Sequence, residues 1–250
     1  MHIFGGKFRS ILRGPDRADT STIEDWRSLR LDIQVCFLFS HPAHKYVPVT
    51  DIEPLQKHDS VRTVEDALAH ISHPQPVQLD PSGSSAATQQ VLVEELPPVL
   101  VLHLKRFLYN AEADGIVKIS KPVQFAPELE IPLGTVFSFI SLALARAKNS
   151  RGLVGSEIMA PVAEKSVELP RYKLYGVLYH HGQLADSGHY TVDVLQSEGG
   201  GSVESWMHVD NEAVSAVQHG DVFGGGDNEK EDDRCAYMLF YYRIAPAQIC

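Results

Sequence analysis

The sequence has little cysteine, little basic charge and no long apolar segment, and each shortage argues against a class of protein. Its three cysteines, Cys36, Cys235 and Cys250, form no CxxC pair, which argues against a disulfide scaffold and a cysteine-rich zinc site. With 22 basic and 32 acidic residues, the formal net charge is −10, unlike that of a protein that binds nucleic acid by neutralising phosphates. We expect no nucleic-acid partner, no metal and no cofactor.

Targeting and membrane-spanning segments are also missing. The N-terminal residues MHIFGGKFRS contain no apolar segment of the secretory type. The longest apolar run, Leu133–Ala145, is shorter than the roughly 20 residues that span a bilayer as a helix. We therefore expect no membrane partner and a reduced protein located in the cytoplasm, with the nucleus as a second location. The run itself predicts a surface helix or a poorly integrated excursion from the sheet.

The 250 residues, 44% of them hydrophobic and 22% charged, are typical of a globular domain with a sizeable core. The first third is irregular apart from Trp26–Ile33, where apolar residues alternate as in a half-buried strand. Residues Thr63–Ile71 predict a helix, because Thr63 can cap it with Asp66 three residues later. The stretch Pro81–Thr88 is rich in serine, glycine and alanine and predicts a loop.

The rest of the chain is strand-like. Residues Val99–Phe107 begin with apolar side chains on both faces, as in a central strand. Further strands are predicted over Tyr172–Tyr179, His189–Leu195, Val203–Val209 and Ala236–Arg243. Short connections between successive strands favour antiparallel pairing. The predicted fold class is α+β, with an antiparallel sheet in the second half.

A histidine and an aspartate on neighbouring predicted strands form a candidate catalytic pair. His189 stands between a polar loop and a strand, so the strand can hold the ring while one nitrogen stays open to a nucleophile. If the next strand pairs in antiparallel fashion, its end at Asp210 returns to the level of His189. A carboxylate there would fix the tautomer and stabilise the imidazolium, and Asn211 is the alternative orienter. The pair still needs a nucleophile or a metal.

A metal hydrolase is one way to complete such a pair. Its ligands would come from a group of donors around these strands: His180, His181, His189, Asp193 and His208. No HExxH or comparable spacing supports this hypothesis. A zinc content below stoichiometry would exclude it.

Three motifs resemble those of the ubiquitin-specific proteases, a family of cysteine deubiquitinases. Residues Leu96–Phe107 match its LPxxL…LxLKRF strand. Residues Tyr175–Val192 resemble its histidine box, with an HxG and a GHYTV sequence. Residues Trp206–Arg243 resemble its closing WxxxD[DN]…AYxLxYxR pattern. The order and separation of the motifs also fit, and the pattern is most similar to the subgroup of ubiquitin-specific protease 10 and its fungal counterparts.

The resemblance implies a papain-like fold, described in this family as fingers, palm and thumb, and a thiol-dependent hydrolysis at the C-terminal glycine of ubiquitin. His189 would be the general base and Asp210 its orienter. Three further residues, His180, Gly188 and Tyr190, would flank the channel for the C-terminal tail of ubiquitin. The expected partners are ubiquitin, ubiquitinated proteins and a regulatory protein.

The sequence departs from the family pattern in two respects. The family's nucleophile lies in an N-terminal box, GxxNxGNxCYxN, which does not occur here. We therefore expect a single partial catalytic domain without the thumb, with fingers in residues 1–60, palm in residues 61–250 and no activity on its own. Residues 35–59 and 134–156 interrupt the pattern and are interpreted as lineage-specific insertions or translated introns. The alternative function is an inactive ubiquitin-binding or scaffold fragment.

Overall fold

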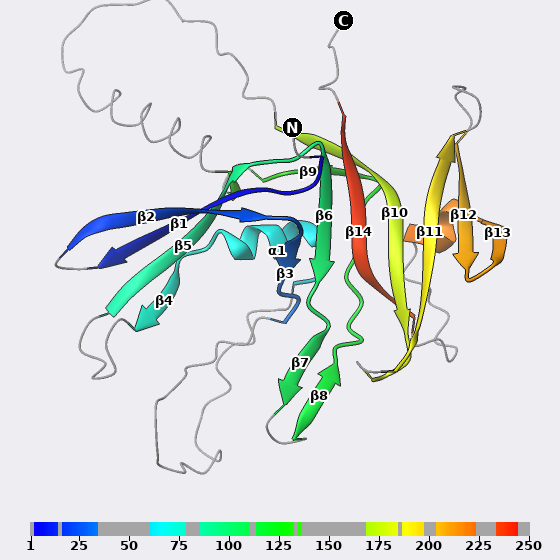
Figure 1. Ribbon diagram of the computed structural model, residues 1–250, viewed down its shortest axis with the longest axis horizontal. Coiled ribbons are helices and arrows are strands. Elements are labelled where there is room, and N and C mark those ends of the chain that lie inside the picture. Colours follow the sequence, from blue (N-terminus) through cyan, green and yellow to red (C-terminus); the bar gives the residue numbers. More distant parts are fainter. Residues whose placement is uncertain are drawn as a thin grey trace, which may run out of the picture.

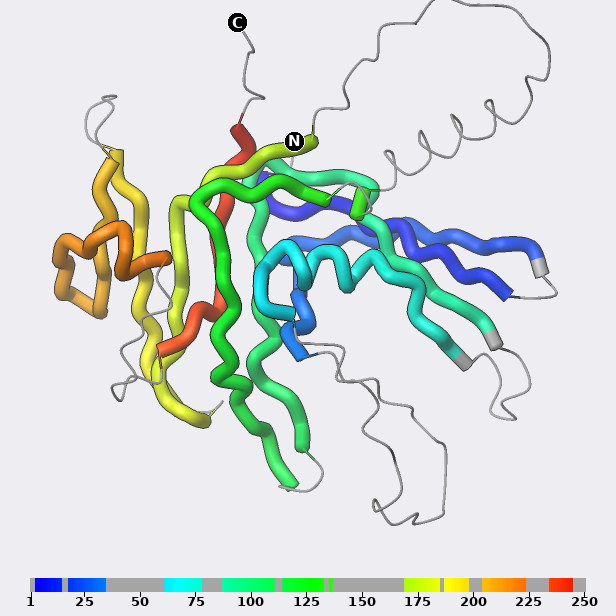
Figure 2. The backbone as a smooth tube through the Cα atoms, turned by 180° about the vertical axis from the view of Figure 1, so that it is seen from behind, coloured from blue at the N-terminus to red at the C-terminus, as the bar shows by residue number. Residues whose placement is uncertain are grey.

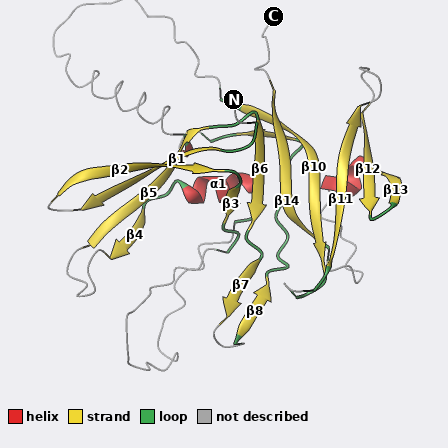
Figure 3. Ribbon diagram, viewed as in Figure 1, coloured by secondary structure: helices red, strands yellow, loops and turns green. Residues whose placement is uncertain are grey.

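The computed structural model describes residues 3–14, 17–34, 61–78, 86–110, 114–132, 135–136, 169–184, 187–197, 204–223 and 234–244. They form a large sheet, a smaller sheet beside it and a projecting hairpin (Figure 1). Strands dominate the described chain, and the two helices lie behind the large sheet as viewed in Figure 3. This architecture agrees with the predicted α+β class and with its antiparallel sheet.

The large sheet has the strand order β13-β12-β11-β10-β14-β6-β3, and β9 pairs with β10 outside this path. β3 joins β6 in parallel, and the other described neighbours are antiparallel. The strand bounds are β3 Leu29–Leu31, β6 Val99–Leu104, β9 Glu128–Glu130, β10 Arg171–His181, β11 His189–Ser197, β12 Glu204–Asp210, β13 Ala213–Val217 and β14 Cys235–Ile244. The strands predicted in the second half are all present in this sheet.

Alternation and burial explain why these segments are strands. In β3, Leu29 and Leu31 are buried and the residue between them is exposed. β6 lies between two other strands, and four of its six residues are buried, as expected of a central strand. Most of the buried residues of β3, β6, β10 and β14 belong to one hydrophobic core. The core therefore lies under the middle of the large sheet, beside the strands that carry the candidate site.

The smaller sheet corrects two expectations. It has the order β2-β1-β5-β4, with β1 Gly6–Gly14, β2 Arg17–Trp26, β4 Gln75–Gln78 and β5 Ala86–Glu95. The first third is thus regular; its strands are mostly half-buried or exposed, which weakens their hydrophobic pattern. The strand β5 begins inside the expected loop, at Ala86. The strand β3 joins the large sheet, whereas β4 and β5 join the small one.

Helix α1, Val64–Ile71, begins as predicted. The side chain of Thr63 accepts a hydrogen bond from the amide of Asp66, and the side chain of Asp66 accepts one from the amide of Thr63. The helix buries Val64, Ala67 and Leu68, and it packs against β3 and β5. From behind, in Figure 2, it lies between the large and the small sheet. It therefore links the two sheets through the core. The second helix, α3, is His219–Phe223 and packs against β12.

The apolar run Leu133–Ala145 is described only at two residues. Thr135 and Val136 are buried, and Val136 belongs to the core and bridges to Val93 of β5. At these two residues the run differs from the surface excursion that we expected, because the core extends this far. The rest of the run lies outside the described residues, as do residues 35–59 and most of residues 134–156. None of the helices in the described part of the chain has the length and apolar character required to cross a bilayer.

A two-stranded hairpin projects from the lower edge of the large sheet in Figure 1. Its strands are β7 Phe107–Asn110 and β8 Gly115–Lys118, and Phe107 pairs with Lys118 at its base. Arg106, directly before β7, is 1% exposed. Its guanidinium donates to the carbonyl oxygens of Ala236, Ile119 and Lys121. Arg106 is therefore a buried anchor of the hairpin rather than a solvated strand end.

Candidate active site

His189 and Asp210 meet across neighbouring strands, as the sequence predicts. His189 is the first residue of β11, and Asp210 is the last residue of β12. The antiparallel register, with Val192 opposite Val209, brings these two strand ends to the same edge of the sheet. His189 Nε2 lies 2.5 Å from Asp210 Oδ1. This distance confirms that the pair is hydrogen bonded, with Nε2 as the donor to the carboxylate.

The pairing leaves the second ring nitrogen of His189, Nδ1, as the one that can accept a proton from a nucleophile. The side chains of His189 and Asp210 are 43% and 42% exposed, so an incoming group can reach the ring. A carboxylate bonded to one nitrogen of an imidazole holds its tautomer and orientation. The geometry is thus that of a general base with its orienter.

Asn211, the alternative orienter, is a turn residue. It lies in the tight turn between β12 and β13, where Asp210 pairs with Ala213. Its φ is +52°, a left-handed conformation that asparagine tolerates better than most residues. In the described part of the chain, the hydrogen-bond partner of His189 is Asp210 and not Asn211. Asn211 therefore shapes the turn that follows the carboxylate.

His181 lies beside His189 on the neighbouring strand β10. The two residues are register partners, and their ring centroids are 5.7 Å apart. His181 Nε2 lies 2.9 Å from Thr191 Oγ1, and Thr191 is buried. This hydrogen bond fixes the His181 ring next to His189.

His180, expected beside the channel for the ubiquitin tail, is buried beneath the surface. Only 1% of His180 is exposed, whereas Gly188 and Tyr190 lie at the surface, with Tyr190 46% exposed. The His180 ring is edge-on to Tyr190 at 4.9 Å and to Phe107 at 5.2 Å. Burial, with the charges of Lys118 and His181, lowers the pKa of His180 below its ordinary value. His180 is therefore a neutral ring that supports the surface formed by Gly188 and Tyr190.

A second aspartate–histidine pair lies on β11 and β12: Asp193 is four residues beyond His189, and its register partner His208 is two residues before Asp210. The carboxylate of Asp193 is 0% exposed, and its Oδ1 lies 2.6 Å from His208 Nδ1. Its other oxygen accepts a hydrogen bond at 2.5 Å from Arg234, whose guanidinium also covers the Tyr179 ring. Burial raises the pKa of Tyr179 well above its ordinary value. The sequence analysis named Asp193 and His208 only as donors of a metal site, and it predicted neither their pairing nor the contact of Asp193 with Arg234.

The donors that the metal-hydrolase hypothesis would bring together are bound to separate partners. His189 pairs with Asp210 and His208 with Asp193, while His181 binds a hydroxyl group. Among the described residues, no three histidine, cysteine, aspartate or glutamate side chains gather as they would to hold a metal ion.

Cys235 is buried at the start of β14, where its Sγ lies 3.7 Å from the carbonyl oxygen of His180. Cys36 and Cys250 lie outside the described residues. Cys235 has neither the exposure nor the imidazole contact that a nucleophilic thiol requires. We therefore assign Cys235 to the packing between β10 and β14.

Comparisons with known proteins agree with the motifs and the fold. The sequence profile described as ubiquitin carboxyl-terminal hydrolase matches residues 1–241. The chain is 32% identical over 250 residues to the probable ubiquitin carboxyl-terminal hydrolase 3 of Schizosaccharomyces pombe, a match that covers 96% of this chain and 39% of that protein. It is 30% identical over 251 residues to ubiquitin carboxyl-terminal hydrolase 10 of Rattus norvegicus, covering 97% of this chain and 24% of that protein. These matches confirm the expected subgroup.

The solved structures show the same fold at lower sequence identity. The SAGA Ubp8/Sgf11/Sus1/Sgf73 DUB module bound to ubiquitin aldehyde matches with a TM-score of 0.62 and 19% identity, covering 98% of this chain and 42% of that one. A SAGA DUB module bound to monoubiquitin matches with a TM-score of 0.63 and 18% identity, with the same coverage of both chains. The chain thus spans less than half of each of these relatives.

Proposed function

The chain belongs to the ubiquitin carboxyl-terminal hydrolase family, and from this premise we propose that it carries the acid–base half of a thiol-dependent deubiquitinase. The reaction is hydrolysis of the peptide or isopeptide bond that follows the C-terminal glycine of ubiquitin. The observation that carries the proposal is the 2.5 Å contact between His189 Nε2 and Asp210 Oδ1 at one edge of the sheet. We infer that the attacking cysteine comes from a cysteine-box segment, a motif that these 250 residues do not contain.

In the first half of the reaction, His189 accepts the thiol proton at Nδ1, and the thiolate attacks the carbonyl carbon of the terminal glycine. The imidazolium is stabilised by the carboxylate of Asp210, which keeps Nε2 protonated throughout. The bond between the glycine carbonyl carbon and the leaving nitrogen then breaks. His189 returns the proton from Nδ1 to the leaving amine, and ubiquitin remains bound to the cysteine as a thioester.

In the second half, the same imidazole removes a proton from water. The resulting hydroxide adds to the thioester carbonyl, and the thiolate leaves. Ubiquitin is released with a free carboxyl group, and the cysteine and His189 return to their starting states. Each proton therefore passes through the nitrogen of His189 that Asp210 leaves open.

The experiment uses two proteins, the 250-residue chain and the same chain joined to a family cysteine-box segment. The second should cleave a ubiquitin amide of a fluorogenic amine. His189→Ala should lower its kcat by about a thousandfold or more, because it removes the general base. Ubiquitin affinity should stay within about twofold, since the substitution removes one side chain from a binding surface that we propose to extend over both sheets. Wild-type turnover by His189→Ala would overturn the proposal.

A ubiquitin-binding scaffold without activity is the second candidate, favoured by the absence of the cysteine-box motif. A ubiquitin probe with a C-terminal electrophile separates the two functions. Covalent labelling of the extended chain supports the enzyme, whereas binding without labelling supports the scaffold.

We also propose ubiquitin and ubiquitinated proteins as partners, together with a regulatory protein. In support, solved relatives with this fold are DUB modules that contain several proteins, and some are bound to ubiquitin aldehyde or monoubiquitin. The cytoplasmic location, with the nucleus as a second site, stays a prediction.

A further inference from the structure

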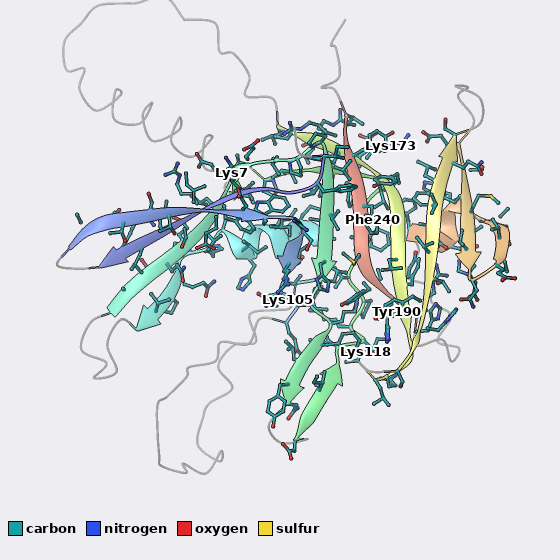
Figure 4. The ribbon with its side chains drawn as sticks, viewed as in Figure 1. Lys7, Lys105, Lys118, Lys173, Tyr190 and Phe240 are labelled. Atoms are coloured by element: carbon teal, nitrogen blue, oxygen red, sulfur yellow. The ribbon has the colours of Figure 1, made fainter. Side chains whose placement is uncertain are left out.

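The segment that connects β10 to β11 contains the surface residues that precede His189. Lys118 forms a hydrogen bond with the first residue of this segment. Lys118, the last residue of β8, extends its ammonium group to the end of β10. Its Nζ donates to the carbonyl oxygens of Gly182, at 2.5 Å, and His180, at 3.2 Å. Figure 4 shows Lys118 and Tyr190 at the same end of β10, with Lys173 at the opposite end. Lys118 thus reaches the site from the hairpin.

The base of the hairpin holds His180 in two ways. Phe107 and Lys118 are register partners across β7 and β8. Phe107 places its ring at 5.2 Å from the His180 ring, edge-on, while Lys118 binds the His180 carbonyl oxygen. Neither ring nitrogen of His180 has a hydrogen-bond partner among the described residues. The ring therefore depends on these packing and backbone contacts for its position.

The two ends of the connection pack against this held strand end. Gly182 has φ +95°, and a Cβ placed on it would lie 3.5 Å from the Cα of Gly188. A Cβ on Gly188 would lie 2.4 Å from His180 Nε2 and 2.6 Å from the carbonyl oxygen of His181. Gly188 therefore rests directly on the His180 ring. A shift of Gly182 or His180 would pass through these contacts to Gly188 and then to Tyr190.

We propose that Lys118 is a positioning residue that holds Gly182 and Gly188, the two ends of this connection, in the arrangement that receives the C-terminal tail of ubiquitin. This inference rests on the proposed function and adds a residue that touches neither the reacting atoms nor His189. The pair His189–Asp210 is set independently by the register of β11 and β12. Loss of Lys118 should therefore weaken binding of the tail more than it slows the chemical step.

The test compares Lys118→Met, which removes the donor, with Lys118→Arg, which keeps charge and N–H groups. Lys118→Gln is a milder second variant that keeps a donor without the charge. Lys173→Met is the matched control, because Lys173 lies near the other end of β10 in an ion pair with Glu204. Amide hydrogen exchange is measured on the 250-residue chain, and kcat and KM for the ubiquitin amide on the chain joined to the cysteine-box segment.

Lys118→Met should speed exchange at Gly188 to Tyr190 by roughly tenfold or more, the factor that a charge-assisted hydrogen bond contributes. It should raise KM by a similar factor and change kcat by less than about threefold. Lys118→Arg should restore most of the exchange protection and of the KM. Lys118→Gln should give values between those of Lys118→Met and Lys118→Arg, and Lys173→Met should match the wild type.

Unchanged exchange and KM in Lys118→Met would overturn the inference, as would faster exchange spread evenly over the sheet. The inference would also be overturned if Lys118→Arg showed the same faster exchange and higher KM as Lys118→Met. If His189→Ala kept wild-type turnover, the proposed function would fail, but the exchange measurement, which needs no activity, would still decide the role of Lys118.

Discussion

Replacing Asp210 by asparagine tests the orienting carboxylate with little change of shape. The asparagine oxygen can still accept the hydrogen bond from His189 Nε2, which Asp210 accepts at 2.5 Å. The negative charge is lost, however, and the imidazolium that forms when His189 takes up the thiol proton loses its counter-charge. The effect should therefore fall on the transition state more than on ubiquitin binding.

The exposure of the pair sets the size of the effect. The side chains of His189 and Asp210 are 43% and 42% exposed, so solvent screens their attraction. For unit charges about 4 Å apart, Coulomb's law gives roughly 1 kcal/mol at the dielectric constant of water and roughly 4 kcal/mol at an effective value of about 20. These energies correspond to a decrease in kcat/KM of about fivefold to about a thousandfold. His189→Ala should lose more, because it removes the base itself.

The assay is hydrolysis of the fluorogenic ubiquitin amide by the chain joined to the cysteine-box segment, with ubiquitin affinity measured beside it. Asn211→Gly is the comparison, since glycine keeps the left-handed turn at φ +52° and removes the neighbouring amide side chain. Asp210→Asn should lose more activity than Asn211→Gly. The reverse order would show that Asn211 is the orienter, and full activity in Asp210→Asn would refute the electrostatic reasoning.

Two further predictions concern stability. Thr63→Ala removes the oxygen that accepts a hydrogen bond from the amide of Asp66 at 3.1 Å. It should lower the free energy of unfolding in urea by about 1 kcal/mol, and Thr63→Ser should lower it less. An unchanged free energy of unfolding in Thr63→Ala would count against the cap. Because the pKa of His180 is lowered in the fold, the unfolded chain binds more protons below its ordinary pKa of about 6.5, and stability falls as the pH drops below that value. His180→Phe should reduce the slope of the free energy of unfolding against pH by up to about 1.4 kcal/mol per pH unit. Denaturant titrations at several pH values measure this slope. An unaltered slope would show that the His180 ring is not held neutral.

Local sequence patterns were sufficient to predict most strands of the large sheet and the candidate pair. The strands β10, β11, β12 and β14 show short-range alternation and short connections, which are properties of neighbouring residues. Antiparallel pairing of two successive strands places the start of one beside the end of the next, so His189 and Asp210 could be brought together without knowledge of the rest. The same holds for α1, whose capping residues Thr63 and Asp66 are three positions apart.

The supports of the site were decided by tertiary structure alone. Lys118 binds carbonyl groups that are 62 and 64 positions away, and Arg106 binds one that is 130 positions away. No local pattern specifies such contacts, because they depend on which distant segments the core brings together. The sequence by itself therefore determined β10, β11, β12 and β14 and the His189–Asp210 pair. Only the packing of the hairpin against β10 placed His180 beneath the surface and Lys118 under the connection that leads to His189.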